Sequence, residues 1–317
     1  MARRAGVSQS TVSLVLSGKS AGRISARTEK AVRRAAEELG YRPNVAARAL
    51  RTGATRTVGM VVTDVTNPFF AFVLRGAQAA AWRAGYAVAL VDVANDPDRE
   101  RASFEALRAG SADGFLFFTV EPPAPLGEHV VAIEVGPPGM PSVRFDVERG
   151  TELAVGHLLE LGHTRIGHLG SNIEGETFRR RRTRMDAVLA AHGLEPGPRA
   201  LAAFRFEAAR VAALELLDAP ERPTAVFCDD DILAGGVYMA ARERGLRIPA
   251  DLSVIGFDDL PFAQVLEPPL TTVAIDAERL GGTAFEVLES LIAGEPPGPD
   301  RVLPAELLVR ESTAPPP

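Results

Sequence analysis

The chain has 317 residues, of which 46% are hydrophobic and 24% are charged, a composition typical of soluble globular domains. Its one cysteine, Cys228, cannot form an internal disulfide, so no oxidising compartment is indicated. No apolar run approaches the ~20 residues of a membrane span. No apolar stretch follows the charged start at Arg3 and Arg4, which argues against a secretory signal. We expect a cytoplasmic protein without membrane contact, with one small domain and one or two larger ones.

The net charge of −6 is distributed unevenly along the sequence. Residues 1–56 contain twelve Lys or Arg and three Asp or Glu, a net charge of +9, which leaves −15 for residues 57–317. A basic segment ahead of an acidic chain indicates that this segment alone meets a polyanion such as a nucleic acid. The alternative is a basic, solvent-exposed face without a binding role.

In chain order, the first 56 residues are predicted to form short helices. A short helix is expected over residues 9–16, with Ser8 as its N-cap. A second helix is expected over 26–39, where apolar side chains recur at helical spacing. Pro43 breaks the pattern, and a third helical stretch is expected over 45–51.

From Thr57 onward, short apolar runs alternate with amphipathic stretches. The predicted strands are 58–63, 86–93, 114–119, 130–135, 165–169, 225–228 and 252–257. The predicted helices are 69–83, 99–109, 150–161, 179–192, 207–217 and 232–244. Sustained alternation indicates parallel sheets covered by helices on both faces, and the length favours two such lobes.

The last part of the chain is expected to cross back and complete both lobes. Its predicted elements are a strand at 270–275, a helix at 278–292 and an extended segment at 302–309. The Pro- and Gly-rich stretches at 136–141 and 294–299 are expected to be loops.

The segment AGVSQSTVSLVLSG at residues 5–18 has the pattern of a helix-turn-helix. A small residue and a glycine form the turn, and an apolar face of the following helix packs inward. Short polar side chains at the start of such a helix suit contacts to base edges in the major groove. The predicted DNA contacts in this segment are Ser8, Gln9, Ser10 and Ser13.

This segment, together with ELGYRPN at 38–44 and ARALR at 47–51, resembles the lactose-repressor (LacI/GalR) family, and the resemblance covers essentially the whole chain. It implies a small all-α helix-turn-helix domain at 1–43 and a hinge helix and linker at 44–56. It implies an effector-binding and dimerisation domain at 57–317, similar to periplasmic binding proteins, with two doubly wound parallel α/β sheets. The expected partners are double-stranded operator DNA, a small-molecule effector and a second copy of the chain, with no cofactor and no metal ion.

In the family, the piece after Asn44 is a hinge helix that drives a leucine into the minor groove, and Leu50 matches that leucine. An apolar wedge can unstack a base step while Arg48 and Arg51 hold phosphates. We therefore predict DNA contacts from Asn44, Arg48, Leu50 and Arg51. The alternative for Leu50 is packing in a core.

Two features depart from the family pattern. Only residues 2–5 remain of the first helix, and so short a helix has little intrinsic stability. Either the native start lies upstream or the helix-turn-helix is weakened. Leu14 stands where the family usually has an arginine, which puts the operator preference in doubt.

A ligand pocket is expected at the carboxyl ends of the strands, where open α/β folds bind ligands. The resemblance aligns Arg181 and Asp258 with ligand-binding positions, and Asp230 replaces the usual asparagine. The predicted effector contacts are Phe69, Phe70, Phe118, Glu134, Arg181, Phe204, Asp230 and Asp258. Aromatic faces, carboxylates and one arginine suit a sugar or a sugar-like metabolite. The additional carboxylate leaves a cationic or amine-bearing ligand as an alternative.

Three other functions are considered beside that of a transcription regulator. An enzyme could use the carboxyls of Asp258 and Asp259, but the sequence contains no nucleophile elbow, phosphate-binding glycine loop or zinc-ligand cluster. A periplasmic sugar-binding protein would share the two lobes, but the basic N-terminal segment argues against it. The last alternative is a solute-binding protein of the same fold that has lost DNA binding through the short first helix.

Overall fold

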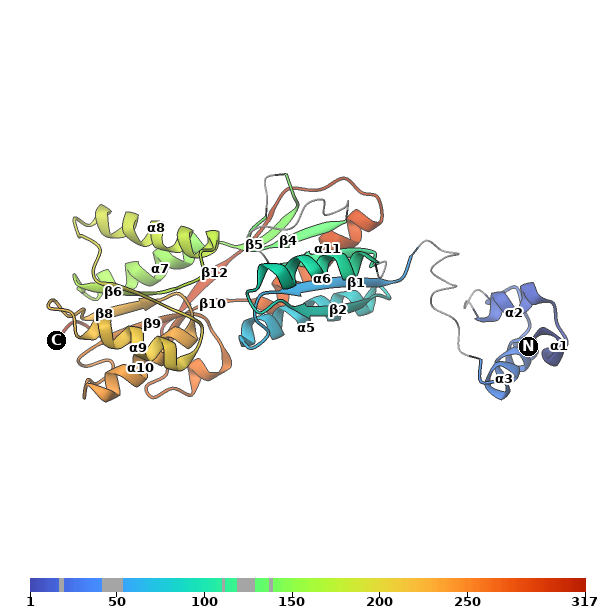
Figure 1. The fold of residues 1–317 in the computed structure, drawn as a ribbon, viewed down its shortest axis with the longest axis horizontal. Helices are drawn as coiled ribbons and strands as arrows, with labels where there is room; N and C mark the ends of the chain where they lie inside the picture. Colours follow the sequence, from blue (N-terminus) through green and yellow to red (C-terminus); the bar gives the residue numbers. More distant parts are fainter. Residues whose placement is uncertain (17–19, 42–53, 110–111, 119–128, 137–138) are drawn as a thin grey trace. The chain divides into compact units, whose positions relative to one another are not determined.

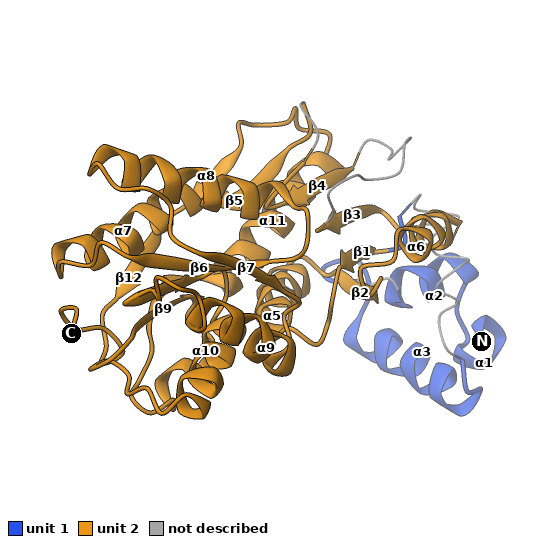
Figure 2. Ribbon diagram, turned by 60° about the vertical axis from the view of Figure 1, so that its left-hand side comes forward, with its two compact units in different colours: residues 1–55 blue, residues 56–317 orange. Residues whose placement is uncertain are grey.

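The computed structural model describes residues 1–16, 20–41, 54–109, 112–118, 129–136 and 139–317. The chain divides into two compact units, residues 1–55 and residues 56–317 (Figure 2). The predicted hinge helix and its DNA contacts Asn44, Arg48, Leu50 and Arg51 lie outside the described residues and stay predictions.

The described part of the N-terminal unit contains the helices α1 (Ala2–Ala5), α2 (Gln9–Leu16) and α3 (Ala26–Glu38). Gly6 ends α1 in the left-handed conformation with φ 67°, which glycine adopts without steric cost. Val12, Val15 and Val32 form the buried centre, against which Ala2 and Ala5 of α1 also pack. The short first helix is therefore held by packing, which compensates for its low intrinsic stability.

The first lobe of the larger unit contains a six-stranded sheet in the order β11-β5-β4-β3-β1-β2, with every neighbouring pair parallel. Its strands are β1 (Thr57–Val62), β2 (Ala87–Asp92), β3 (Gly114–Phe117), β4 (Val130–Ile133), β5 (Ser142–Phe145) and β11 (Arg301–Leu303). Its helices are α5 (Pro68–Arg83), α6 (Pro97–Ala109) and α11 (Ala277–Ile292).

Alternation along β1 explains how helices cover both faces of this sheet. Val58, Met60 and Val62 belong to the apolar cluster that includes α5 and α11, whereas Val61 packs with Phe104 of α6. Successive side chains of a strand point to opposite faces, so a continuous apolar run is buried on both sides.

The second lobe has a six-stranded sheet in the order β12-β10-β9-β8-β6-β7. Its strands are β6 (Ile166–Ser171), β7 (Arg199–Ala202), β8 (Ala225–Cys228), β9 (Ser253–Asp258), β10 (Thr271–Ile275) and β12 (Ala305–Leu308). Its helices are α7 (Val147–Glu160), α8 (Glu176–Ala191), α9 (Phe206–Leu217) and α10 (Asp231–Glu243), with a short 3-10 helix at Pro261–Gln264. Figure 1 shows these helices around the second sheet.

The chain passes between the lobes three times, after β5, after β10 and between β11 and β12. The segment expected as one element at 302–309 is thus two strands in different sheets, separated by Pro304. This confirms that the C-terminal part completes both lobes. One apolar cluster includes side chains from both sheets, such as Phe145 and Phe257.

Three details differ from the sequence prediction. Strand β12 runs antiparallel to β10, a single departure from otherwise parallel sheets. Strands β5 and β7 were not predicted. Both are only four residues long, and in β7 the alternate side chains of Arg199 and Leu201 are exposed, so pairing with neighbouring strands rather than an apolar run defines them. Among the described helices, none is long and apolar enough to cross a membrane.

Glycines allow α5 and α11 to approach closely. A Cβ on Gly281 would lie 1.9 Å from the carbonyl oxygen of Val73, and one on Gly76 would lie 1.8 Å from that of Glu278. We expect Gly281→Ala to lower the free energy of unfolding by at least about 2 kcal/mol, because the backbones must separate. Urea unfolding followed by circular dichroism measures this change.

Gly156→Ala is the matched control, since this glycine lies inside helix α7 and nothing approaches its added Cβ within 4 Å. It should leave stability unchanged or raise it by up to about 1 kcal/mol. A Gly281→Ala protein as stable as the parent would contradict the packing argument.

Candidate functional site

The N-terminal unit presents the start of α2 to solvent. The predicted DNA contacts Ser8, Gln9, Ser10 and Ser13 are all exposed, while Val12 and Val15 on the opposite face are buried. Ser8 also caps the helix, because its Oγ accepts a hydrogen bond from the backbone N–H of Thr11 at 3.1 Å. The hydroxyl of Ser8 also lies 2.7 Å from that of Ser10, and the side chains of Gln9 and Ser13 are exposed to solvent.

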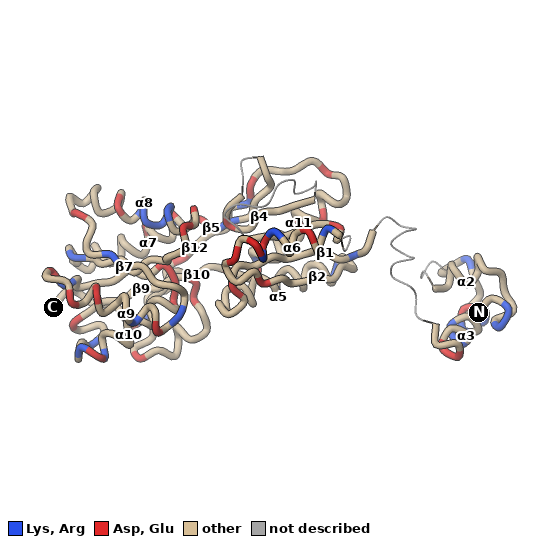
Figure 3. The backbone as a smooth tube through the Cα atoms, in the orientation of Figure 1, with Lys and Arg blue, Asp and Glu red and all other residues tan. Residues whose placement is uncertain are grey.

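Lys and Arg positions recur along the N-terminal unit (Figure 3). Arg23, Arg27 and Lys30 are exposed. The acidic residues of the unit are partly neutralised internally, since Glu29 pairs with Arg33 at 2.7 Å and Glu38 pairs with both Arg4 and Arg34 at 3.0 Å. The unit therefore keeps a positive field suited to a phosphate backbone.

In the larger unit, one pocket lies between the two lobes and encloses a cavity of about 130 Å³. A cavity needs about 10–15 Å³ of this kind of volume to hold one water. This cavity can therefore hold roughly ten waters, which is close to the size of a single sugar ring. All eight predicted effector contacts line it: Phe69, Phe70, Phe118, Glu134, Arg181, Phe204, Asp230 and Asp258. Most of them follow the carboxyl ends of strands or begin the helices after them.

Phenylalanines form the apolar walls. On the first lobe, Phe69, Phe70 and Phe118 meet edge to face, with ring centroids 5.0–5.9 Å apart. On the second lobe, Phe178 and Phe204 lie 5.6 Å apart. The mutual packing of these rings fixes their positions, so the walls are preformed.

The polar end of the pocket is formed by Asp230 and Asp258. Asp230 is 2% exposed and caps α10 by accepting the N–H of Ile232 at 2.5 Å. Burial raises the pKa of Asp230 to about 6. Burial, followed by the negative charge of Asp230, raises the pKa of Asp258 well above its ordinary value. Two close carboxyls in a poorly solvated place resist ionising together.

Arg181 supplies the cation of the pocket. It is 5% exposed, donates to the backbone carbonyl of Asp229, and stacks on the ring of Phe257 at 3.7 Å. Its Nε is buried and has no hydrogen-bond partner among the residues that the structure describes. A buried donor without a partner is costly, so Arg181 is ready to donate to a ligand.

Asp229 positions Arg181 and is itself held by a neighbour. Its carboxylate accepts from Ser171 N–H at 2.9 Å and lies 3.0 Å from His168 Nε2. Although burial opposes it, the adjacent His168 lowers the pKa of Asp229, so this carboxylate stays ionised. His168 therefore has a structural partner.

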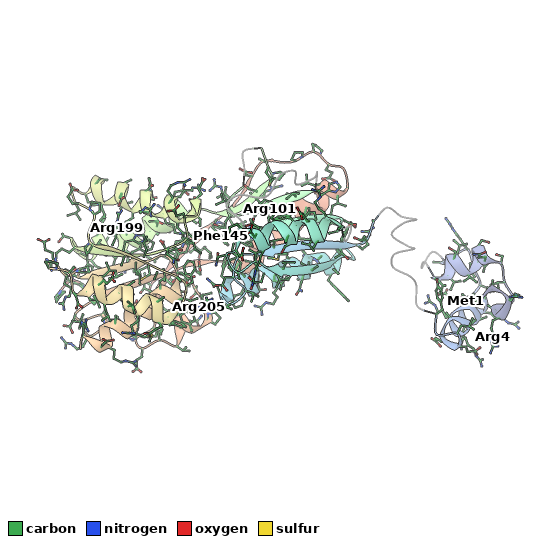
Figure 4. All side chains as sticks on the ribbon, in the orientation of Figure 1. Met1, Arg4, Arg101, Phe145, Arg199 and Arg205 are labelled. Carbon is green, nitrogen blue, oxygen red and sulfur yellow. The ribbon has the colours of Figure 1, made fainter. Side chains whose placement is uncertain are left out.

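Three polar contacts join the lobes across the pocket. Asn67 Nδ2 donates to Asp230 at 2.9 Å, Arg205 pairs with Asp64 at 2.9 Å, and Thr177 donates to Glu134 at 3.3 Å. Arg205 extends from the second lobe, and Phe145 lies where the lobes join (Figure 4). Because each contact has one partner per lobe, any change in the angle between the lobes must break or form these bonds.

Two carboxyl residues of the pocket have a strained backbone. Glu134 has φ 72° and Asp258 has φ 104°, values that non-glycine residues adopt only when their surroundings compensate. The strain places both carboxyls at the pocket wall immediately after β4 and at the end of β9.

The pocket also contains residues that the sequence analysis did not assign to it. Asn67 caps α5 by accepting Phe69 N–H at 2.9 Å, and its amide nitrogen donates to Asp230. The unassigned lining residues include Asp64, Asn67, Thr177, Phe178 and Asp229. Their position next to strand ends was a usable signal for Asp64 and Asp229. None existed for Thr177 and Phe178, which lie inside α8.

Comparisons with known proteins agree with this geometry. Residues 1–44 match the family described as bacterial regulatory proteins, lacI family, and residues 155–313 match a periplasmic binding protein-like domain. The HTH-type transcriptional repressor CytR of Escherichia coli (strain K12) is 33% identical, over 99% of this chain and 95% of the relative.

Solved structures show the same fold. A lac repressor dimer bound to operator and the anti-inducer ONPF matches with a TM-score of 0.89 and 27% identity, over 99% of this chain and 97% of that one. A LacI family regulator from Enterococcus faecium with bound ribose matches with a TM-score of 0.75 and 28% identity, over 82% and 99% of the two chains. The chain described here therefore belongs to the lacI family of bacterial regulatory proteins.

Proposed function

We propose that the protein is a transcriptional repressor that binds operator DNA as a homodimer and loses or gains operator affinity when a small, sugar-sized molecule occupies the pocket. The observation that carries this proposal is the presence, in one chain, of an exposed polar helix start on a basic unit and a closed pocket between two lobes. The relatives named above are a repressor, a repressor dimer on its operator, and a regulator with bound ribose.

The N-terminal unit would read DNA through α2. Gln9 can donate to and accept from an adenine edge, and the serines can bind bases or phosphates. Two copies of the unit would read two half-sites of a pseudo-palindrome. Residues 44–56 would act as the hinge, with Leu50 as a wedge in the minor groove between Arg48 and Arg51.

The larger unit would convert ligand binding into a change of operator affinity. A ligand that binds one lobe arrangement better than another shifts the population toward it. Asn67, Asp64 and Glu134 each bond to the opposite lobe, so they distinguish those arrangements. The coupling free energy equals the difference in ligand affinity between the two states.

The pocket would bind its ligand without catalysing a reaction. In this proposal Asp230, Asp258 and Glu134 accept hydrogen bonds from the ligand, and Arg181 donates one. The protein would act where its operator lies, in the cytoplasm, without catalysis.

The first prediction concerns the DNA-reading helix. The purified chain should bind DNA from its own promoter region far more tightly than scrambled DNA at near-physiological salt, because base contacts add to the phosphate contacts. Gln9→Ala should weaken promoter binding by about 1–3 kcal/mol, the value of one good base contact. Fluorescence anisotropy with both DNAs measures the two affinities.

Gln264→Ala is the control, since this exposed glutamine lies in the larger unit. It should leave promoter affinity unchanged. Equal binding of the parent to both DNAs would reject a sequence-specific regulator and favour a solute-binding protein.

The second prediction concerns the pocket. Once a screen of pentoses and hexoses finds a molecule that alters promoter binding, Asp258→Ala should weaken its affinity by about ten- to hundredfold, as expected for a lost bond to a charged group. Calorimetry measures that affinity. Promoter affinity without the molecule should not change, and unaltered calorimetric affinity would remove Asp258 from the binding site.

A further inference from the structure

The polar end of the pocket carries more negative than positive charge. Asp230, Asp258 and Glu134 all line it, and Arg181 is its one buried cation among the described residues. Arg181 is already engaged with the backbone of Asp229 and stacked on Phe257. The side chain of Asp229 adds a further carboxylate, which is held by His168 and Ser171.

The hydrogen bonds of these carboxyls differ. Asp230 uses both oxygens, one for Ile232 N–H and one for Asn67 Nδ2. Glu134 also uses both, for Phe145 N–H and Thr177 Oγ1. Among the residues that the structure describes, Asp258 receives no N–H donor, and its carboxyl interacts with that of Asp230. Each carboxylate oxygen can accept a second hydrogen bond, so Asp230 keeps part of its acceptor capacity and Asp258, which lines the same pocket, is the less engaged of the two.

Such a pair behaves differently toward neutral and cationic ligands. Burial raises the pKa of both carboxyls, and the negative charge of Asp230 raises that of Asp258 further, so a neutral ligand leaves the ionised pair uncompensated. An ammonium group supplies the missing positive charge and three donors, so it can bond to both carboxylates while they are ionised. Buried charges are tolerated when they are paired in this way.

The other walls suit a ring that carries this group. The cluster of Phe69, Phe70 and Phe118 offers apolar ring faces and edges, and aromatic faces also attract cations. At the other side, the unpartnered Nε of Arg181 requires an oxygen acceptor. The cavity accommodates a single ring of sugar size.

We propose that the effector is an amine-bearing monosaccharide, whose ammonium group binds between Asp230 and Asp258 and whose oxygen accepts a hydrogen bond from Arg181. This inference rests on the proposed function and names the ligand class of that same pocket. Asp230 thereby acts as the residue that selects amino sugars over neutral sugars.

The test uses pairs of sugars that differ in one group, an ammonium against a hydroxyl. The probes are D-glucosamine with D-glucose, D-galactosamine with D-galactose and D-mannosamine with D-mannose. Calorimetry on the full-length protein at neutral pH measures each affinity. For at least one pair, the amino sugar should bind about ten- to hundredfold more tightly than its partner, the range expected for a bond between charged groups.

Two variants identify the residue responsible. Asp230→Asn keeps the size of the side chain but removes its charge, and it should reduce the preference to less than about threefold, well under the value of one charged bond. Asp259→Asn is the matched control, because this neighbouring carboxylate pairs with Arg310 at 2.6 Å and does not line the cavity. It should retain the full preference. Circular dichroism verifies that both variants are folded.

Three outcomes would overturn the inference: neutral sugars that bind as tightly as their amino partners, a preference that survives in Asp230→Asn, or no binding of any probe at millimolar concentration. Promoter binding by the same samples separates these failures from failure of the proposed function. A chain that binds its promoter and is released by a neutral sugar keeps the function and loses the amino-sugar inference. If the chain prefers amino sugars but does not bind its promoter specifically, the amino-sugar inference is kept and the proposed function is rejected.

Discussion

The larger unit depends on one geometric constraint, which is that nearly all strands of both sheets run parallel and end at a shared pocket. Parallel pairing places the carboxyl ends of neighbouring strands at one edge, and three chain crossings bring the two edges together. The buried hydrogen bond from Asn67 to Asp230 spans the pocket at 2.9 Å. The phenylalanine walls, the carboxyl pair and the contacts between the lobes all follow from this meeting of strand ends.

Because the strand ends bury carboxyls in this pocket, its free energy depends on which molecule the pocket contains. Closure of the lobes removes Asp230 from water, and desolvated carboxyls cost free energy unless positive charge or hydrogen bonds offset it. Asn67 and the start of α10 supply part of that compensation for Asp230. No N–H donor among the described residues compensates Asp258 in this way. A ligand can therefore supply the hydrogen bond or positive charge that Asp258 lacks. In the proposed mechanism, the same few atoms would couple ligand binding to the arrangement of the lobes.

Local patterns in the sequence were sufficient for much of this structure. The alternation of apolar runs with amphipathic stretches predicted two lobes. The family resemblance, together with the rule that ligands bind at strand ends, predicted that Phe118, Glu134 and Asp258 line the pocket, and all three do. The prediction was incomplete where pairing partners decide the outcome. Four-residue strands such as β5 and β7 carry no distinct apolar signal, and the antiparallel direction of β12 follows from a chain crossing at Pro304.

The sequence by itself determined the helix-turn-helix, the alternation of most strands with helices, and the residue types at strand ends, because these depend on local periodicity, capping and turn chemistry. Only the tertiary structure decided that Asn67 bonds to Asp230, that Arg205 pairs with Asp64, and that Asp258 lies beside Asp230 with a strained backbone. These are contacts between residues up to 163 positions apart. No local pattern encodes them, because they form only when both sheets have assembled and the buried groups must find partners.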